Sequence, residues 1–121
     1  MITDLIKQIE SSYYWDARVK KLDCSNFGDE VNLVFEDGDI DVVYHFEDCY
    51  QIQIIHSIEY SKINSSKELT RNQLPYFMQD VQVEEIRIDA MNFLQFKINL
   101  FPIELHILCK TFRIRSDNPI S

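Results

Sequence analysis

The sequence predicts an α+β protein with a mainly antiparallel sheet of about six to seven strands, an N-terminal helix and a short helical segment near residues 66–79. Two observations support this fold class. Apolar residues recur at helical spacing only near the N-terminus, whereas apolar and polar residues alternate through most of the remaining chain. Successive strand-like runs are joined by short turns and not by long helices, which is typical of antiparallel sheets.

The chain is long enough for one domain. Its 121 residues are 45% hydrophobic, with eight Phe and six Tyr, so a single core can form. We therefore expect one domain over residues 1–121, with a loose polar tail from about residue 116. The chain shows neither a signal peptide nor an apolar run long enough for a membrane span, and its three cysteines are widely spaced. These features favour a cytoplasmic protein with buried free thiols.

The first predicted element is an amphipathic helix near the N-terminus. Its apolar side chains recur every three or four residues, at Ile2, Leu5, Ile6 and Ile9. The helix should end in the segment "SSYYWD". There we expect a helix-to-strand corner, with Trp15 packed in the core and Asp16 capping backbone N–H groups.

The clearest strands form a hairpin over residues 30–46, after a first strand with imperfect alternation in "RVKKLDCS". The "EDGD" between them predicts a tight turn at Asp37-Gly38, because glycine readily adopts the positive φ that hairpin turns require. Alternation then places the apolar residues of both strands on one face. These residues are Val31, Leu33 and Phe35 on the first strand, and Ile40, Val42, Tyr44 and Phe46 on the second.

The remaining chain predicts further strands around one helical connection. Residues 50–60 continue as strand, and the doublet Ile54-Ile55 indicates a bulge or a change of face. A short helix is expected to begin near Ser66 and to be limited by Pro75. Three strands follow, and Phe101-Pro102 separates the last two. Their predicted inward residues are Leu94, Phe96, Ile98 and Leu100, then Ile103, Leu105, Ile107 and Cys109.

The charge is strongly and unevenly negative. Twenty acidic and twelve basic residues give a net charge of -8, and no Lys or Arg occurs from Leu22 to Ser61. This balance argues against binding to nucleic acid or to an anionic membrane surface, since both require basic residues. It leaves two interpretations open: a solubilising surface, or an acidic face that attracts a basic partner.

The segment "EDGDIDVVYHFEDCY" combines residue types that bind metals and move protons. Its glycine and acidic positions do not match a calcium-binding loop, and no His or Cys pair has the usual zinc spacing, so we expect no metal and no cofactor. No nucleophile motif is present. His45 and Cys49 would lie roughly 13 Å apart along a strand. We therefore expect no enzymatic activity.

A protein-binding surface fits this segment better than a catalytic site. If the apolar side chains face the core, the carboxylates lie at the turn, at the strand end or on the outer face, where they remain solvated. Aromatic residues at the rim of such a face could anchor a partner. The predicted contact residues are Glu36, Asp37, Asp39, Asp41, Tyr44, His45, Glu47, Asp48 and Tyr50.

Several segments resemble small bacterial immunity proteins of polymorphic-toxin and contact-dependent growth inhibition systems. They are "YYWDARVKKLDCS", "VNLVF", "VVYHFEDCYQI" and "FLQFKINL…LHILCKTFRI", although Trp15 stands where a His often precedes the Asp. The resemblance implies a short helix leading into strands and a protein that binds and neutralises a cognate toxin, often a nuclease. A basic toxin would suit the acidic surface.

Two further possibilities follow from the residues. A pocket between sheet and helix, lined by Tyr and Phe, would indicate a small-ligand-binding or regulatory domain. Exposed strand edges could also pair two copies of the chain in a homodimer.

Overall fold

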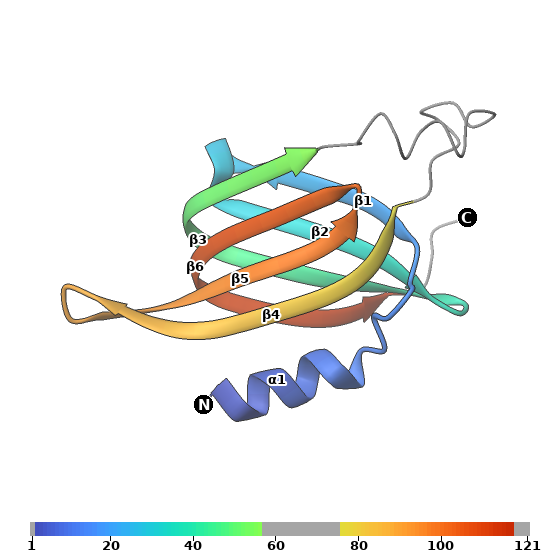
Figure 1. Ribbon diagram of the computed structural model, residues 1–121, viewed down its shortest axis with the longest axis horizontal. Helices are drawn as coiled ribbons and strands as arrows, with labels where there is room; N and C mark the ends of the chain where they lie inside the picture. The colour runs from blue at the N-terminus through green and yellow to red at the C-terminus, as the bar shows by residue number, and fades with distance from the viewer. Residues whose placement is uncertain (1, 57–75, 118–121) are drawn as a thin grey trace.

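The computed structural model describes residues 2–56 and 76–117 (Figure 1). These described residues form one helix, one 3-10 turn and six strands that pair antiparallel in the order β1-β2-β3-β6-β5-β4. The predicted fold class is therefore confirmed. The elements are α1 (Ile2–Ser11), β1 (Val19–Ser25), η1 (Asn26–Gly28), β2 (Glu30–Asp37), β3 (Ile40–His56), β4 (Phe77–Ile88), β5 (Met91–Phe101) and β6 (Ile103–Asp117).

The sheet curls until its two outer strands meet at one point. Arg18 and Phe77 form a bridge, and the Met78 N–H donates to the Ala17 carbonyl at 2.8 Å. The Val19 N–H donates to the Tyr76 carbonyl at 2.7 Å. The result is a partly closed barrel with α1 lying alongside β4 (Figure 1). Within the described residues, no helix has the length and hydrophobicity needed to cross a bilayer.

The core fills the concave side of this sheet. On β2 and β3 the directly opposed pairs Val31–Phe46, Leu33–Tyr44 and Phe35–Val42 all point inward and are almost fully buried, as the alternation predicts. The inward faces predicted for the last two strands are also confirmed. Their buried members are Phe96, Ile98, Leu100, Leu105, Ile107 and Cys109.

β3 is one long strand whose alternation changes near its middle. Asp48 has a positive φ of 52°, and the pairing with β6 shifts between Cys49 and Gln51. The doublet Ile54-Ile55 pairs in regular register, so the predicted bulge or change of face lies earlier, between Cys49 and Gln51. Because of the change, Ile52 packs against the core while Tyr50 points outward.

Three other expectations need correction. Most of the helical segment predicted near residues 66–79 lies outside the described residues, but its C-terminal end belongs to β4. The tail predicted to be loose from about residue 116 begins as strand, because β6 continues to Asp117. Tyr14, not Trp15, enters the core: Trp15 is 50% exposed and stacks on the Tyr14 ring.

A hydroxyl pair joins α1 to the core. The hydroxyls of Ser12 and Tyr44 lie 2.6 Å apart, and the Ser12 hydroxyl also donates to the Ile9 carbonyl. Tyr44 therefore serves as the donor to Ser12. Burial raises the pKa of Tyr44 above its usual value, and the bond to Ser12 opposes this shift. The contact allows a hydroxyl to be buried at the end of the helix without losing its hydrogen bond.

We expect Ser12→Ala to destabilise the protein by about 1–3 kcal/mol, because the buried Tyr44 hydroxyl loses its partner. Adding Tyr44→Phe to this variant removes the hydroxyl that has lost its partner, and should recover part of the lost stability. The free energy of unfolding is measured by urea denaturation for the wild type, both single variants and the double variant. Equal stability of Ser12→Ala and the wild type would contradict the contact.

Candidate functional site

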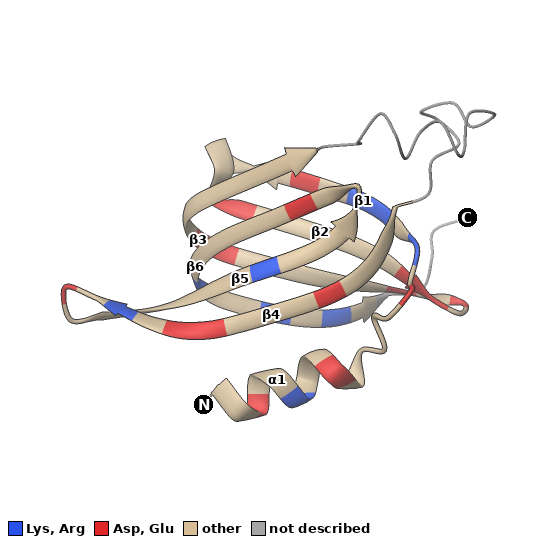
Figure 2. Ribbon diagram, viewed as in Figure 1, with Lys and Arg blue, Asp and Glu red and all other residues tan. Residues whose placement is uncertain are grey.

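The carboxylates predicted to contact a partner lie on and around the β2–β3 hairpin. Glu36 and Asp41 face each other across the two strands, and Gly38, with a φ of 61°, forms the turn. The acidic turn projects at one end of the barrel (Figure 2). The predicted hairpin is confirmed, and its turn lies one residue later than expected, at Gly38-Asp39.

Half of these carboxylates are paired with cations from distant parts of the sequence. Arg18 lies 3.5 Å from Glu36, and Lys20 lies 3.1 Å from Asp41. On the other side of β3, the Arg113 guanidinium lies 2.6 Å from Glu47. The carboxylates of the stretch without Lys or Arg are thus neutralised in part by residues that precede β2 or lie on β6.

The remaining predicted carboxylates are available to a partner. Asp37, Asp39 and Asp48 form no ion pair with any residue that the structure describes. Asp39 and Asp48 are exposed, and Asp37 is half-buried. The acidic character that a partner would meet is therefore concentrated at the β2–β3 turn and at the change of alternation in β3.

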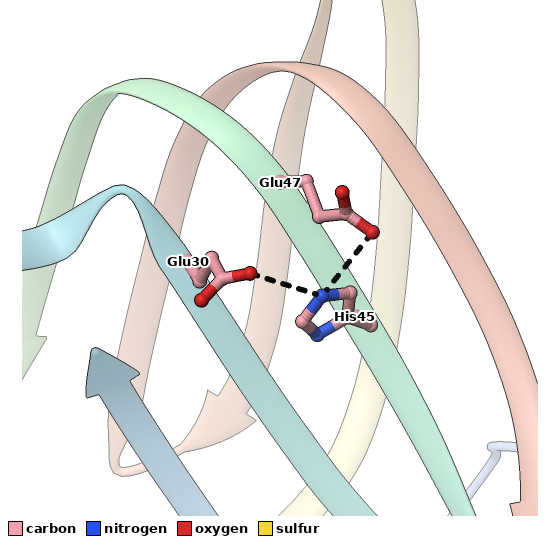
Figure 3. Close-up of side chains that lie close together, drawn as sticks. All are labelled: Glu30, His45 and Glu47. Carbon is pink, nitrogen blue, oxygen red and sulfur yellow. Dashed lines mark ion pairs between the residues drawn. The ribbon is translucent and has the colours of Figure 1, made fainter. Parts of the chain in front are cut away.

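His45 lies at the centre of a polar network on the outer face of β2, β3 and β6 (Figure 3). Its Nε2 is 3.8 Å from Glu30 and 3.3 Å from Glu47, and its Nδ1 is 2.5 Å from the Asn32 oxygen. The network continues from Glu47 to Arg113, which is directly opposite His45 on β6. It links three strands by side-chain contacts.

The network offers three ligand atoms, one each from Glu30, His45 and Glu47, within 4.8 Å of one another. Such a set can bind a metal or move a proton in principle. Here Glu47 is already bound to the Arg113 guanidinium, whose positive charge opposes a second cation at that carboxylate. We interpret the cluster as a cross-strand network that orients side chains on the outer face.

The other histidines have separate partners. His56 lies 3.2 Å from the Tyr76 hydroxyl, and His106 lies 3.0 Å from Glu104, on other parts of the sheet. His106 and the Lys97 ammonium lower the pKa of the Glu104 carboxyl. No contact joins His45 to either of these pairs among the described residues.

The cysteines have the character of packing residues. Cys49 and Cys109 face each other across β3 and β6, and burial raises the pKa of the Cys49 thiol to about 11 and that of Cys109 to about 12. Both thiols are therefore protonated at neutral pH and are poor nucleophiles. All three cysteines are free, but Cys24 is exposed, contrary to the expectation that all are buried.

Only one of the two predicted aromatic contacts lies at the surface. Tyr44 is fully buried, so its prediction as a contact residue is wrong; its position on the inward face of β3 dictates this outcome. Tyr50 is 59% exposed. Its ring packs edge-on against Phe93 at 4.9 Å, and the Lys110 ammonium lies 5.7 Å from its centre.

The pocket expected by the small-ligand alternative has a different character in the structure. An open hollow does lie between α1 and the sheet, but its lining mixes polar side chains such as Lys7 and Gln8 with aliphatic ones such as Ile40 and Ile114. Among the described residues of this lining, Tyr13 is the one aromatic. A specific small-ligand site would enclose more apolar surface, so this hollow does not favour the alternative.

Sequence reasoning missed the partners of the predicted residues. Arg18, Lys20 and Arg113 neutralise three of the carboxylates, while Glu30 and Asn32 hold His45. One signal was present: Arg113 and Arg115 alternate with apolar residues on the last strand, which places them on its polar face. Their pairing with β3 depends on strand order, which alternation does not specify.

Comparisons with known proteins identify a protein family and a similar solved structure. The model of a protein family described as "Immunity protein PIM7" matches residues 1–116. A crystal structure of an uncharacterized protein from Neisseria gonorrhoeae is similar, with a TM-score of 0.52 and 13% identity over 88% of this chain and 94% of that chain. At this identity the second likeness concerns the fold alone. No curated protein matches the chain in sequence.

We expect the His45 network not to bind divalent metals, because the Glu47 carboxylate is already paired with the Arg113 guanidinium. Addition of zinc or of a chelator should therefore leave the melting temperature unchanged. Arg113→Ala removes the competing cation and serves as the comparison variant. A rise of several degrees with zinc in the wild type, absent from His45→Ala, would contradict the interpretation.

Proposed function

The chain belongs to the immunity protein PIM7 family, and we propose that it binds and neutralises a cognate bacterial toxin in the cytoplasm. In this proposal it acts by occupying a surface of the toxin, without catalysing a reaction and without a cofactor. The toxin would be delivered by a contact-dependent growth inhibition system or another polymorphic-toxin system. The family match over residues 1–116 is the observation that carries the proposal.

We further propose that the toxin is a nuclease domain with a basic surface. A nuclease must attract phosphates, so its substrate cleft carries Lys and Arg. A protein with a net charge of -8 is electrostatically complementary to such a cleft. The same charge makes nucleic acid and anionic membranes unfavourable partners for the chain itself.

The predicted contact residues differ in what binding would require of them. Asp37, Asp39 and Asp48 have no ion pair to give up among the described residues, so a basic partner can engage them directly. Four of the others, Glu36, Asp41, His45 and Glu47, would first have to exchange existing partners. We therefore assign the first group to early electrostatic contact with the toxin and the second to the surrounding rim.

The direct experiment is co-expression with the product of the adjacent upstream reading frame. We expect that product to arrest growth when it is produced alone, and to be harmless when this chain is present. The two proteins should then co-purify as a complex. A version of the gene with an early stop codon, transcribed from the same plasmid, controls for an effect of the mRNA alone.

Two results would contradict the proposal. One is failure of the two proteins to associate in any growth condition. The other is protection that persists with the early stop codon, because protection would then not depend on the protein.

Electrostatic attraction predicts a specific change in association rate. Asp37→Lys with Asp39→Lys should slow association with the toxin about tenfold or more at low salt, and the difference should shrink as salt is added. Asp4→Lys with Asp80→Lys makes the same change in net charge away from the turn. Stopped-flow measurements compare the two pairs; equal rates for both would remove the turn from the interface.

A further inference from the structure

The β4–β5 hairpin extends beyond the rest of the sheet as a two-stranded ribbon (Figure 1). β5 pairs with β6 only from Leu94 onward, whereas its pairing with β4 continues out to Ile88–Met91. The turn at Asp89-Ala90 has positive φ angles of 49° and 65°. A positive φ is uncommon for alanine, so this turn holds a conformation that its sequence does not favour.

One face of this ribbon is apolar. Ile86 lies opposite Phe93, and Ile88 lies opposite Met91, so alternation places all four side chains on the same side. Ile88 is 44% exposed and Met91 is 38% exposed. The other face carries the opposed polar pair Arg87–Asn92. A solvated ribbon would have no need for apolar residues on either face.

The apolar face continues onto the main sheet through Tyr50. Phe93 is almost fully buried, although it is not part of the central core, and the Tyr50 ring packs against it. Tyr50 itself remains largely exposed. We define the ribbon patch as Tyr50, Ile86, Ile88, Met91 and Phe93.

A hollow whose lining holds two aspartates and one lysine borders the ribbon patch. It is lined by Asp29, Asp48, Cys49, Tyr50 and Lys110. Neither of the two aspartates forms an ion pair with a described residue. The Cys49 N–H donates to the Asp29 carbonyl at 3.0 Å, and this bond holds the two sides of the hollow together.

We propose that the ribbon patch is the apolar centre of the toxin-binding surface, and that the toxin places a Lys or Arg side chain in the adjoining hollow. The inference rests on the proposed function and adds the ribbon to it. Interface centres are commonly apolar or aromatic and bordered by charged groups. The two aspartates beside Tyr50 form no ion pair with a described residue and outnumber Lys110 in the lining, so they favour a partner surface that is apolar with a basic side chain at its edge.

A second copy of this chain is a poorer occupant. In a symmetric dimer, a surface meets its own equivalent, so the hollow and its aspartates would approach those of the other copy. Each chain also carries a net charge of -8. Both factors oppose self-association through this face and favour a basic partner.

The test replaces residues on opposite faces of the same ribbon. Ile88→Glu with Met91→Glu changes the ribbon patch, and Arg87→Gln with Asn92→Glu makes the same change in net charge on the other face. Calorimetric titration of the full chain with the separately purified product of the adjacent upstream reading frame measures affinity. We expect the first pair to weaken binding about 30-fold or more, and the second to change it less than about threefold.

A second variant keeps the test informative if the first pair prevents folding. Asp29→Asn with Asp48→Asn removes the charges of the hollow, and Asn tolerates the positive φ at position 48. It should weaken binding about tenfold, with a smaller salt dependence than the wild type. Thermal melts verify that each variant is folded.

The outcomes separate the two proposals. Absence of binding by the wild type overturns the proposed function. Wild-type affinity in both the ribbon-patch pair and the hollow pair overturns this inference and leaves the proposed function intact. Light scattering measures the oligomeric state of the wild type and of the variant Ile88→Glu with Met91→Glu. If the wild type is a dimer, the variant is a monomer and the toxin affinity is unchanged, the patch serves self-association.

Discussion

The pairing of β3 with β6 holds the two halves of the sheet together. It runs from Asp41–Asp117 to His56–Ile103 and places the last strand of the sequence at the centre of the sheet. β1 and β2 then lie on one side, and β4 and β5 on the other. The concave core is filled from both halves, as the contact of Phe46 with Phe96 and Phe112 illustrates. The same pairing brings Arg113 beside His45 and Glu47, so core and outer face depend on one set of backbone hydrogen bonds.

A local departure from regular strand geometry determines which aromatic side chains reach the surface. Tyr44 and Tyr50 would share a face in an uninterrupted strand, because they lie six positions apart, an even number. The positive φ of Asp48 and the register shift after Cys49 reverse this relation. Tyr44 therefore joins the core, where Ser12 satisfies its hydroxyl, and Tyr50 packs on Phe93 outside it. An irregularity of this kind re-aims one side chain without breaking the strand.

The outer surface combines neutralised and free charge in a way that suits a protein partner. Glu36, Asp41 and Glu47 are held by cations from β6 or from the segment around the start of β1, which stiffens the hairpin without adding net charge there. Asp39 and Asp48 keep their charge available. Long-range attraction depends on the net charge, whereas a stable complex also needs desolvated apolar contact. The ribbon patch beside Tyr50 supplies a surface of that second kind.

The sequence by itself determined the strand faces, the β2–β3 hairpin and the acidic balance. These properties are local: alternation of apolar residues selects the face of a strand, and Gly38 readily adopts the positive φ of a tight turn. The tertiary structure decided which carboxylates are neutralised, that Tyr44 is buried, and that Ile86, Ile88 and Met91 adjoin Tyr50. Those facts depend on strand order, on the register of β3 with β6 and on one change of alternation at Asp48. Order and register arise from packing between residues far apart in sequence, which a period of two cannot encode.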